Sequence, residues 1–123
     1  MRILYHATPK RNWSGIRRRG LVPSLLPKHV QGATGLRRGI YLDSSEEAAL
    51  GDWAGLSLRD IPEDAESFSE PYAVLEVHVP DSVVLIPDPE VSDIGGQPSA
   101  FIVDTRIPPR SIRYIGESEI EWG

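Results

Sequence analysis

The alternation of apolar and polar residues indicates strands most clearly in the second half of the chain. Residues 72–79 alternate in the manner of a half-buried strand, and the pattern ends at Pro80. Short apolar runs at 3–5 and 39–42 predict two more strands, the first of which ends at His6. Further strands are predicted at 83–86, 100–103 and 111–116, and the last two are expected to pair around a turn at 107–109.

Two short helices are predicted between the early strands. Thr8 offers a capping oxygen and Pro9 is tolerated in a first helical turn, while Gly20 provides a left-handed stop. Ser44 followed by Glu47 resembles a capping box at the start of a second helix. The predicted helices therefore span 9–19 and 44–55, and the segments at 22–38 and 56–71 are interpreted as long loops.

Length and composition predict one soluble domain, residues 1–123, of the α+β class. Apolar residues make up 40% of the chain and charged residues 25%, which is ordinary globular usage and argues against disorder. Cysteine is absent, so neither a disulfide framework nor a thiolate zinc site is expected. No apolar run approaches the ~20 residues of a membrane helix. We therefore expect a cytoplasmic protein without a bound metal or a membrane partner.

Charge is divided unevenly along the chain. Residues 1–40 hold nine basic residues and no acidic one, whereas residues 41–123 hold eighteen acids and four arginines, giving +9 and −14. Mutual attraction of the two parts would account for this division. A cationic groove for a phosphate-bearing ligand of dinucleotide size would account for it too, and is slightly favoured. The net charge of −5 argues against non-specific binding of long nucleic acid.

Three short motifs follow one another along the chain. They are Leu-Tyr-His-Ala-Thr at 4–8, Arg-Gly-Ile-Tyr-Leu at 38–42, and Ala-Phe-Ile-Val followed by Ile-Pro-Pro within 100–109. Taken singly, His6 has the pattern of a structural hydrogen-bonding residue and Tyr41 that of a core aromatic. In this order and spacing, the motifs resemble the ADP-ribosyltransferase superfamily, which contains diphtheria toxin and the poly(ADP-ribose) polymerases. The segment 12–21 is also similar to the helix after the histidine in small members, including the RNA 2′-phosphotransferases.

The resemblance implies a compact split antiparallel β-sheet core with two short helices, and NAD bound as a substrate between the strands of His6 and Tyr41. It implies that His6 hydrogen-bonds a ribose hydroxyl and that the Ala7 backbone holds the nicotinamide amide. Tyr41 is expected to stack on the nicotinamide ring, because an aromatic face suits a partly cationic heterocycle. The remaining expected NAD contacts are Thr8, Arg37, Arg38, Gly39, Ser45 and Trp53.

The third motif departs from the family. Active members carry a glutamate at the start of the penultimate strand, where this chain has Ser99 and Ala100 after Gln97. One interpretation is that Ala100 is an engineered replacement of a natural glutamate. Another is that a nearby residue, Gln97, Asp104 or Glu117, supplies the polar group. In a third, the domain binds NAD or ADP-ribose without efficient chemistry.

The function expected from this resemblance is NAD-dependent mono-ADP-ribosyl transfer to a protein or nucleic-acid acceptor. A small bacterial toxin or defence enzyme, held in check by an antitoxin, would fit that activity. An RNA 2′-phosphotransferase is the alternative enzyme, although 123 residues leave no room for the additional N-terminal lobe of that family. A non-catalytic module that binds NAD, ADP-ribose or RNA is the alternative outside the enzymes.

Overall fold

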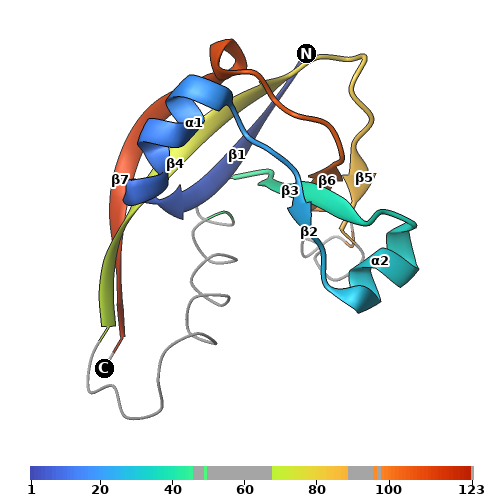
Figure 1. Cartoon of the computed structure of the whole chain (residues 1–123), viewed down its shortest axis with the longest axis horizontal. Coiled ribbons are helices and arrows are strands. Elements are labelled where there is room, and N and C mark those ends of the chain that lie inside the picture. The colour runs from blue at the N-terminus through green and yellow to red at the C-terminus, as the bar shows by residue number, and fades with distance from the viewer. Residues whose placement is uncertain (46–48, 50–67, 89–95, 97, 123) are drawn as a thin grey trace.

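The structure is a computed structural model that describes residues 1–45, 49, 68–88, 96 and 98–122. Within these residues the chain forms an α+β fold, with two short helices and a seven-stranded antiparallel sheet (Figure 1). The helices are α1 (Trp13–Arg19) and α2 (Lys28–Thr34), with 3-10 turns η1 (Lys10–Asn12) and η2 (Pro109–Ser111). The strands are β1 (Arg2–Pro9), β2 (Ser24–Leu25), β3 (Arg38–Asp43), β4 (Phe68–Val79), β5 (Ile86–Pro87), β6 (Ala100–Val103) and β7 (Ile112–Trp122).

The strand order is β5-β6-β3-β1-β4-β7, with β2 paired to β3. All eight residues of β1 pair with β4, and β4 pairs with β7 along most of its length. Between β1 and β3 the register consists of the pair Tyr5 and Asp43. The sheet therefore has a long part, β1-β4-β7, and a short part, β3-β6-β5, which meet at a sparsely paired seam between β1 and β3.

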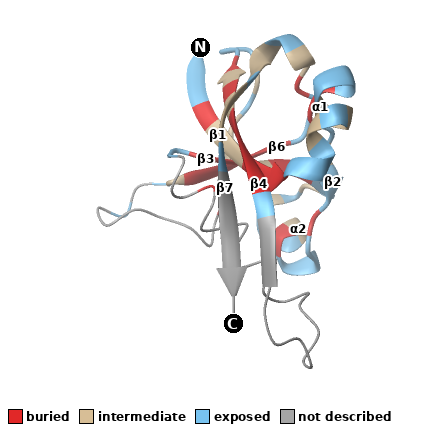
Figure 2. Ribbon diagram, turned by 90° about the vertical axis from the view of Figure 1, so that its left-hand side faces the viewer, coloured by how far each residue is buried: buried red, intermediate tan, exposed pale blue. Residues whose placement is uncertain are grey.

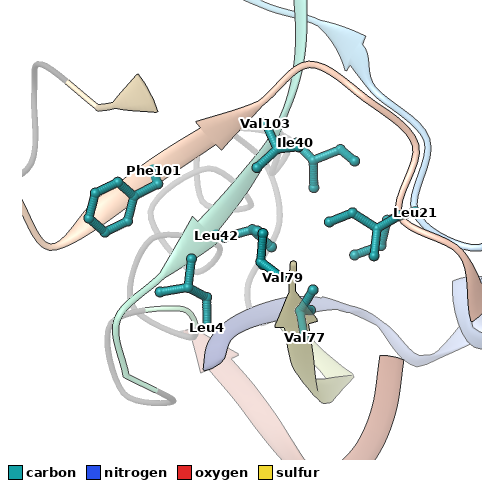
Figure 3. Close-up of a cluster of buried hydrophobic side chains, with 9 residues drawn as sticks. Leu4, Leu21, Ile40, Leu42, Val77, Val79, Phe101 and Val103 are labelled. Carbon is teal, nitrogen blue, oxygen red and sulfur yellow. The ribbon is translucent and has the colours of Figure 1, made fainter. Parts of the chain in front are cut away.

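The main hydrophobic core is built from both parts of the sheet. Leu4 and Val77 contribute from the long part, and Leu42 and Val103 contribute from the short part (Figure 3). Figure 2 shows the buried positions concentrated where these strands come together. Successive side chains of a strand point to opposite faces. Tyr41, which follows Ile40 and precedes Leu42, accordingly packs against a second, smaller cluster of Leu26, Val30 and Ile102.

The first strand is longer than the sequence predicts. His6 lies within β1, not at its end, because Thr8 and Pro9 pair with Ala73 and Tyr72 of β4. The predicted capping role of Thr8 is therefore wrong. The helix begins only after η1, and no side chain caps the N-terminus of α1.

The C-terminal end of α1 is where the sequence predicts it. Gly20 follows the helix with a φ of +83°, and its N–H donates to the Ile16 carbonyl at 2.7 Å. A Cβ at this position would lie 1.9 Å from the Ile107 carbonyl oxygen, so only glycine fits. Leu21 and Ile107 then exchange two backbone hydrogen bonds of 2.9 Å. These bonds fix the end of α1 to the segment that precedes η2.

Other predictions about the chain path also need correction. Strand β4 begins at Phe68, inside the segment 56–71 that was interpreted as a loop, and the strand predicted at 83–86 is observed as β5, Ile86–Pro87. The segment 22–38, interpreted as a loop, contains β2 and α2. Strands β6 and β7 do not pair with each other, because β6 lies between β3 and β5 while β7 lies beside β4. The helix predicted over 44–55 falls mostly outside the described residues. The Ala49 N–H donates to the Ser45 carbonyl at 3.1 Å, which is the spacing of a helical turn.

Candidate functional site

A groove of about 400 Å³ lies between β1 and α1. The strand contributes His6 and Thr8, and the helix and its flanks contribute the opposite wall. The described residues that line that wall are Arg11, Asn12, Ser14, Gly15, Ile16, Arg18, Arg19, Gly20, Leu21 and Val22. Because the end of α1 is fixed to Ile107, this wall is held in place by packing with the C-terminal part of the chain.

His6 is oriented by the neighbouring strand. Its Nδ1 lies 2.8 Å from the Tyr41 carbonyl oxygen, which can only accept, so Nδ1 carries the proton and donates. Burial lowers the pKa of the imidazole, and the hydrogen bond to Tyr41 offsets part of that effect. The ring is therefore neutral at pH 7, and its Nε2 has a lone pair that can accept a hydrogen bond.

The helical wall is strongly cationic. Arg11, Arg18 and Arg19 are exposed along it, and the described residues that line the groove include neither aspartate nor glutamate. Gly15 makes room for one of these side chains, because a Cβ there would lie 2.7 Å from Nη2 of Arg19. The Arg18 Nε donates to the Ser14 carbonyl at 3.3 Å. Three guanidinium groups on one wall make the groove suited to an anion, above all to phosphate oxygens.

Polar side chains at the base of the wall add directional groups. Thr8 is buried, and its Oγ1 accepts a hydrogen bond of 3.0 Å from Nδ2 of Asn12. The Thr8 hydroxyl retains its own proton for donation. The groove thus combines an imidazole acceptor, a hydroxyl and an amide beside the cationic wall.

Tyr41 contributes its backbone carbonyl to this site, and not its ring. Its carbonyl holds His6, whereas its ring packs against the cluster of Leu26 and Ile102 and is not part of the groove lining. Gly39 is buried in the same strand, and a Cβ there would lie 2.3 Å from Cγ2 of Ile102. Gly39 is thus required for the close approach of β3 to β6.

The other residues predicted to contact NAD are dispersed. Arg37 and Arg38 are exposed at the start of β3 and are not among the groove-lining residues. Ala7 is buried in β1, and Ser45 is exposed beyond β3. Two predicted residues, Trp53 and Gln97, lie outside the described residues.

Position 100 lies on the short part of the sheet between two buried carboxylates. Ala100 is 1% exposed and sits directly opposite Asp43 in the β3–β6 pairing. Its carbonyl accepts a 2.9 Å hydrogen bond from the N–H of Asp88, which is also buried. The Ser99 carbonyl accepts from the N–H of Ser44 at 2.9 Å. Neither Glu117 nor Asp104 is part of this arrangement. Glu117 pairs with Lys10 at 2.8 Å on β7, and Asp104 is exposed after β6.

Two of the residues predicted from the sequence, His6 and Thr8, line this groove, but the arginines of its helical wall were not among the predicted residues. Arg11, Gly15 and Arg18 follow one another at helical spacing, which is the pattern that would have placed them on one face. The prediction instead selected Arg37 and Arg38, which are neighbours of Tyr41 only along the chain.

Comparisons with known proteins do not assign this site. No family model matches the sequence, and neither a curated protein nor a solved structure matches it. Within the described residues, no group of three or more histidines and acids is placed to hold a metal ion. None of the helices in that part of the chain is long and apolar enough to cross a membrane.

Proposed function

We propose that this protein is an NAD-dependent mono-ADP-ribosyltransferase whose substrate occupies the groove between β1 and α1. The observation that supports this most is the pairing of His6 with the Tyr41 carbonyl beside three arginines. It brings two motifs, separated by 35 positions in the sequence, into contact at the seam between β1 and β3. The sparse pairing at that seam is also what a split-sheet transferase core requires.

The groove residues fit this substrate by their chemistry. The neutral His6 accepts a hydrogen bond at Nε2, which suits a ribose hydroxyl. Arg18 and Arg19 suit the pyrophosphate, because a guanidinium offers paired donors to phosphate oxygens. When NAD is bound, its nicotinamide leaves with the electron pair of the glycosidic bond, the acceptor nucleophile bonds to C1′, and the acceptor proton passes to solvent. The residues of this chain bind and orient the reactants.

One buried carboxylate, Asp43, lies beside the position of the missing glutamate. It is 3% exposed, lies at the seam opposite Tyr5, and faces Ala100 across the pairing with β6. Side chains directly opposite in an antiparallel pair lie on one face, so Asp43 shares the face of Tyr5 and of position 100. His6 follows Tyr5 in β1 and points to the opposite face, where the groove lies, so we assign Asp43 no contact with the ribose.

The placement of Asp43 is tested with Asp43→Asn, which keeps the shape and removes the charge. NAD turnover and the heat of NAD binding are expected to change by less than about threefold, because Asp43 lies on the face opposite the groove. A fall in turnover of about 10²–10³-fold in a folded variant, the loss expected for a group that stabilises the transition state, would place Asp43 in the reaction.

A binding module without catalysis is the second candidate, and the alanine at position 100 favours it. The groove-lining residues described here also lack a carboxylate. In that case NAD or ADP-ribose binds with measurable heat, and neither the natural chain nor an Ala100→Glu variant releases nicotinamide.

Calorimetric titration of NAD into the natural chain, Arg18→Gln and Arg17→Gln tests the site itself. Both arginines are exposed in the last turn of α1, but only Arg18 lines the groove. Arg18→Gln is expected to weaken binding by about 5–30-fold, the effect of one charge-assisted hydrogen bond, and Arg17→Gln by less than about twofold. No heat with the natural chain, or equal losses in both variants, would reject the groove as the NAD site.

A further inference from the structure

The positive charge beside the groove exceeds what a dinucleotide requires. Arg106 and Arg110, both exposed, lie on the segment that packs against the end of α1. Nη1 of Arg106 donates to the Arg19 carbonyl at 2.6 Å, so this guanidinium is held at the end of the groove wall. We name the cationic strip as Arg11, Arg18, Arg19, Arg106 and Arg110. Its five positive charges exceed the two negative charges of the NAD pyrophosphate.

The strip is a fixed surface. The exchange of two hydrogen bonds between Leu21 and Ile107 ties the end of α1 to the segment of Arg106. Contacts between α1 and η2 place the turn that carries Arg110 beside α1, and Figure 1 shows this orange turn above the helix. The end of α1 and residues 106–111 are therefore adjacent in space although they come from opposite ends of the sequence. The net charge of −5 opposes non-specific binding of long nucleic acid, but it does not describe how charge is distributed over the surface.

The described acids near the strip are fewer than its arginines. Glu117 is paired with Lys10 at 2.8 Å and accepts a hydrogen bond from the Tyr114 hydroxyl. Asp104 is exposed two residues before Arg106, and Asp81 pairs with the amino group of Met1, which lines a hollow with Arg110. This local excess of basic over acidic residues can attract a polyanion.

The composition of the strip favours nucleic acid over an acidic peptide. All five of its cations are arginines, whereas Lys10 beside them is occupied by Glu117. A guanidinium binds phosphate oxygens in a bidentate manner and also stacks on bases, which an ammonium does not do. Val22, at the end of the groove lining, is 59% exposed and offers an apolar contact for a base. A base inside a duplex reaches a groove of about 400 Å³ only after it is taken out of the stack, which costs free energy, so a single strand fits the groove better.

We propose that the cationic strip binds the phosphate backbone of a single-stranded nucleic acid and leads it to the groove, where it is the acceptor. This inference rests on the proposed function for its chemistry, but the binding of the strand is separate from that of NAD. DNA and RNA share the backbone chemistry and are distinguished by the experiment.

The test is fluorescence anisotropy with labelled single-stranded DNA and RNA of about 12 nucleotides, titrated between about 50 and 200 mM salt. Neutralisation of three to five phosphates predicts a slope of log affinity against log salt of about −2 to −3.5 for a single strand. The double variant Arg106→Gln/Arg110→Gln is expected to make this slope less negative by about 1.4 and to weaken binding severalfold. Its heat of NAD binding is expected to be unchanged, because neither residue lines the groove.

Arg37→Gln is the matched control, since Arg37 is an exposed arginine before β3 that lies outside the strip and lines neither the groove nor the hollow beside Arg110. Arg106→Lys tests whether the end of α1 is preserved, because lysine keeps a cation that can donate to the Arg19 carbonyl. A slope near zero, an equal loss with Arg37→Gln, or equal affinity for polyglutamate of matched charge would overturn the proposal. If NAD gives no heat of binding but the affinity for the strand falls steeply with salt, the proposed ADP-ribosyl transfer is rejected and the strip is supported as a nucleic-acid site. If NAD binds with measurable heat but the labelled strand does not bind, the nucleic-acid role of the strip is rejected and the proposed NAD site is not affected.

Discussion

The two α-helices have the same length and the same kind of end but different surroundings. Both α1 and α2 span seven residues, and both are followed by a glycine with positive φ, Gly20 and Gly35. Gly20 is buried against Ile107, whereas no atom lies within 4 Å of a Cβ placed on Gly35. The same local stop therefore fixes α1 to a distant segment and leaves the end of α2 in solvent.

The two helices also differ in what their side chains contact. The last turn of α1 carries three arginines, and none of its residues is buried. The last turn of α2 carries no basic residue, and Val30 is buried in the cluster beneath it. We infer that α1 forms the binding wall of the groove and that α2 stabilises the short part of the sheet. Equal secondary structure thus does not imply an equal role.

The largest expected effect is on the free energy of unfolding, and it distinguishes the end of α1 from the end of α2. Gly20→Ala combines a left-handed backbone with the collision at the Ile107 carbonyl, which disrupts two backbone hydrogen bonds. We expect it to lower the free energy of unfolding by about 3 kcal/mol or more, against about 1 kcal/mol for Gly35→Ala, where only the backbone is strained. Urea denaturation measures both. Equal losses would mean that α1 is not fixed by the Leu21–Ile107 pair.

The packing role of α2 is tested by Val30→Ala. Val30 is 2% exposed, so removal of its two methyl groups is expected to cost about 2 kcal/mol of unfolding free energy. NAD binding at 25 °C should change by less than about twofold, because the variant remains folded and the groove lies beside α1. A loss of NAD affinity as large as that of Arg18→Gln would show that α2 belongs to the site.

The regions in which sequence reasoning succeeded have strong local patterns. The strand predicted at 100–103 coincides with β6, and the strand at 39–42 lies within β3. The helix α2 was missed because its one buried residue, Val30, gives no periodicity among the surrounding prolines and glycines. The capping role of Thr8 was wrong because pairing with β4 outweighed the local preference for a helix start.

The candidate site was predictable only in part, for a related reason. His6 could be singled out from its motif, but its partner is a backbone carbonyl, and a sequence does not reveal which carbonyl lies nearby. The position of Arg19 in the groove wall depends on the pairing of Leu21 with Ile107, residues that are distant in the sequence. Contacts of this kind follow from tertiary packing and not from periodicity.

The pH dependence of unfolding is compared for substitutions of His6, which lines the groove, and of His29 in α2. The pKa of His6 in the folded state is below its ordinary value of 6.5, so the unfolded chain binds more protons. The stability contributed by the neutral ring is complete above pH 6.5 and is lost as the pH falls below that value. We expect the unfolding free energy to decrease less between pH 7 and 5 in His6→Gln than in the natural chain. His29→Gln on the exposed face of α2 is the matched control, and an identical effect of both substitutions would contradict the burial of His6.

The smallest expected effect concerns the attachment of α1 to β7. Trp13 of α1 and Tyr114 of β7 have ring centroids 5.1 Å apart, and the Tyr114 hydroxyl donates to Glu117, which pairs with Lys10. Desolvation, together with the hydrogen bond to Glu117 and its negative charge, raises the pKa of Tyr114 to about 12. Because this pKa exceeds the ordinary value of 10.0, the associated stability is present below pH 10 and is lost between pH 10 and about 12.

Glu117→Gln distinguishes the effect of desolvation on the pKa of Tyr114 from the effects of the Glu117 charge and hydrogen bond. The substitution removes the negative charge and weakens the acceptor, so the pKa of Tyr114 is expected to move from about 12 toward 10.0, while the desolvation by neighbouring groups persists. Ultraviolet absorbance of tyrosinate measures the shift, with Tyr114→Phe subtracted to isolate this residue. The NAD affinity should not change, because Glu117 and Tyr114 lie outside the groove lining. An unchanged pKa would assign the shift to desolvation by packing alone, and the attachment of α1 to β7 would then rest on the Trp13–Tyr114 contact and not on the charged pair.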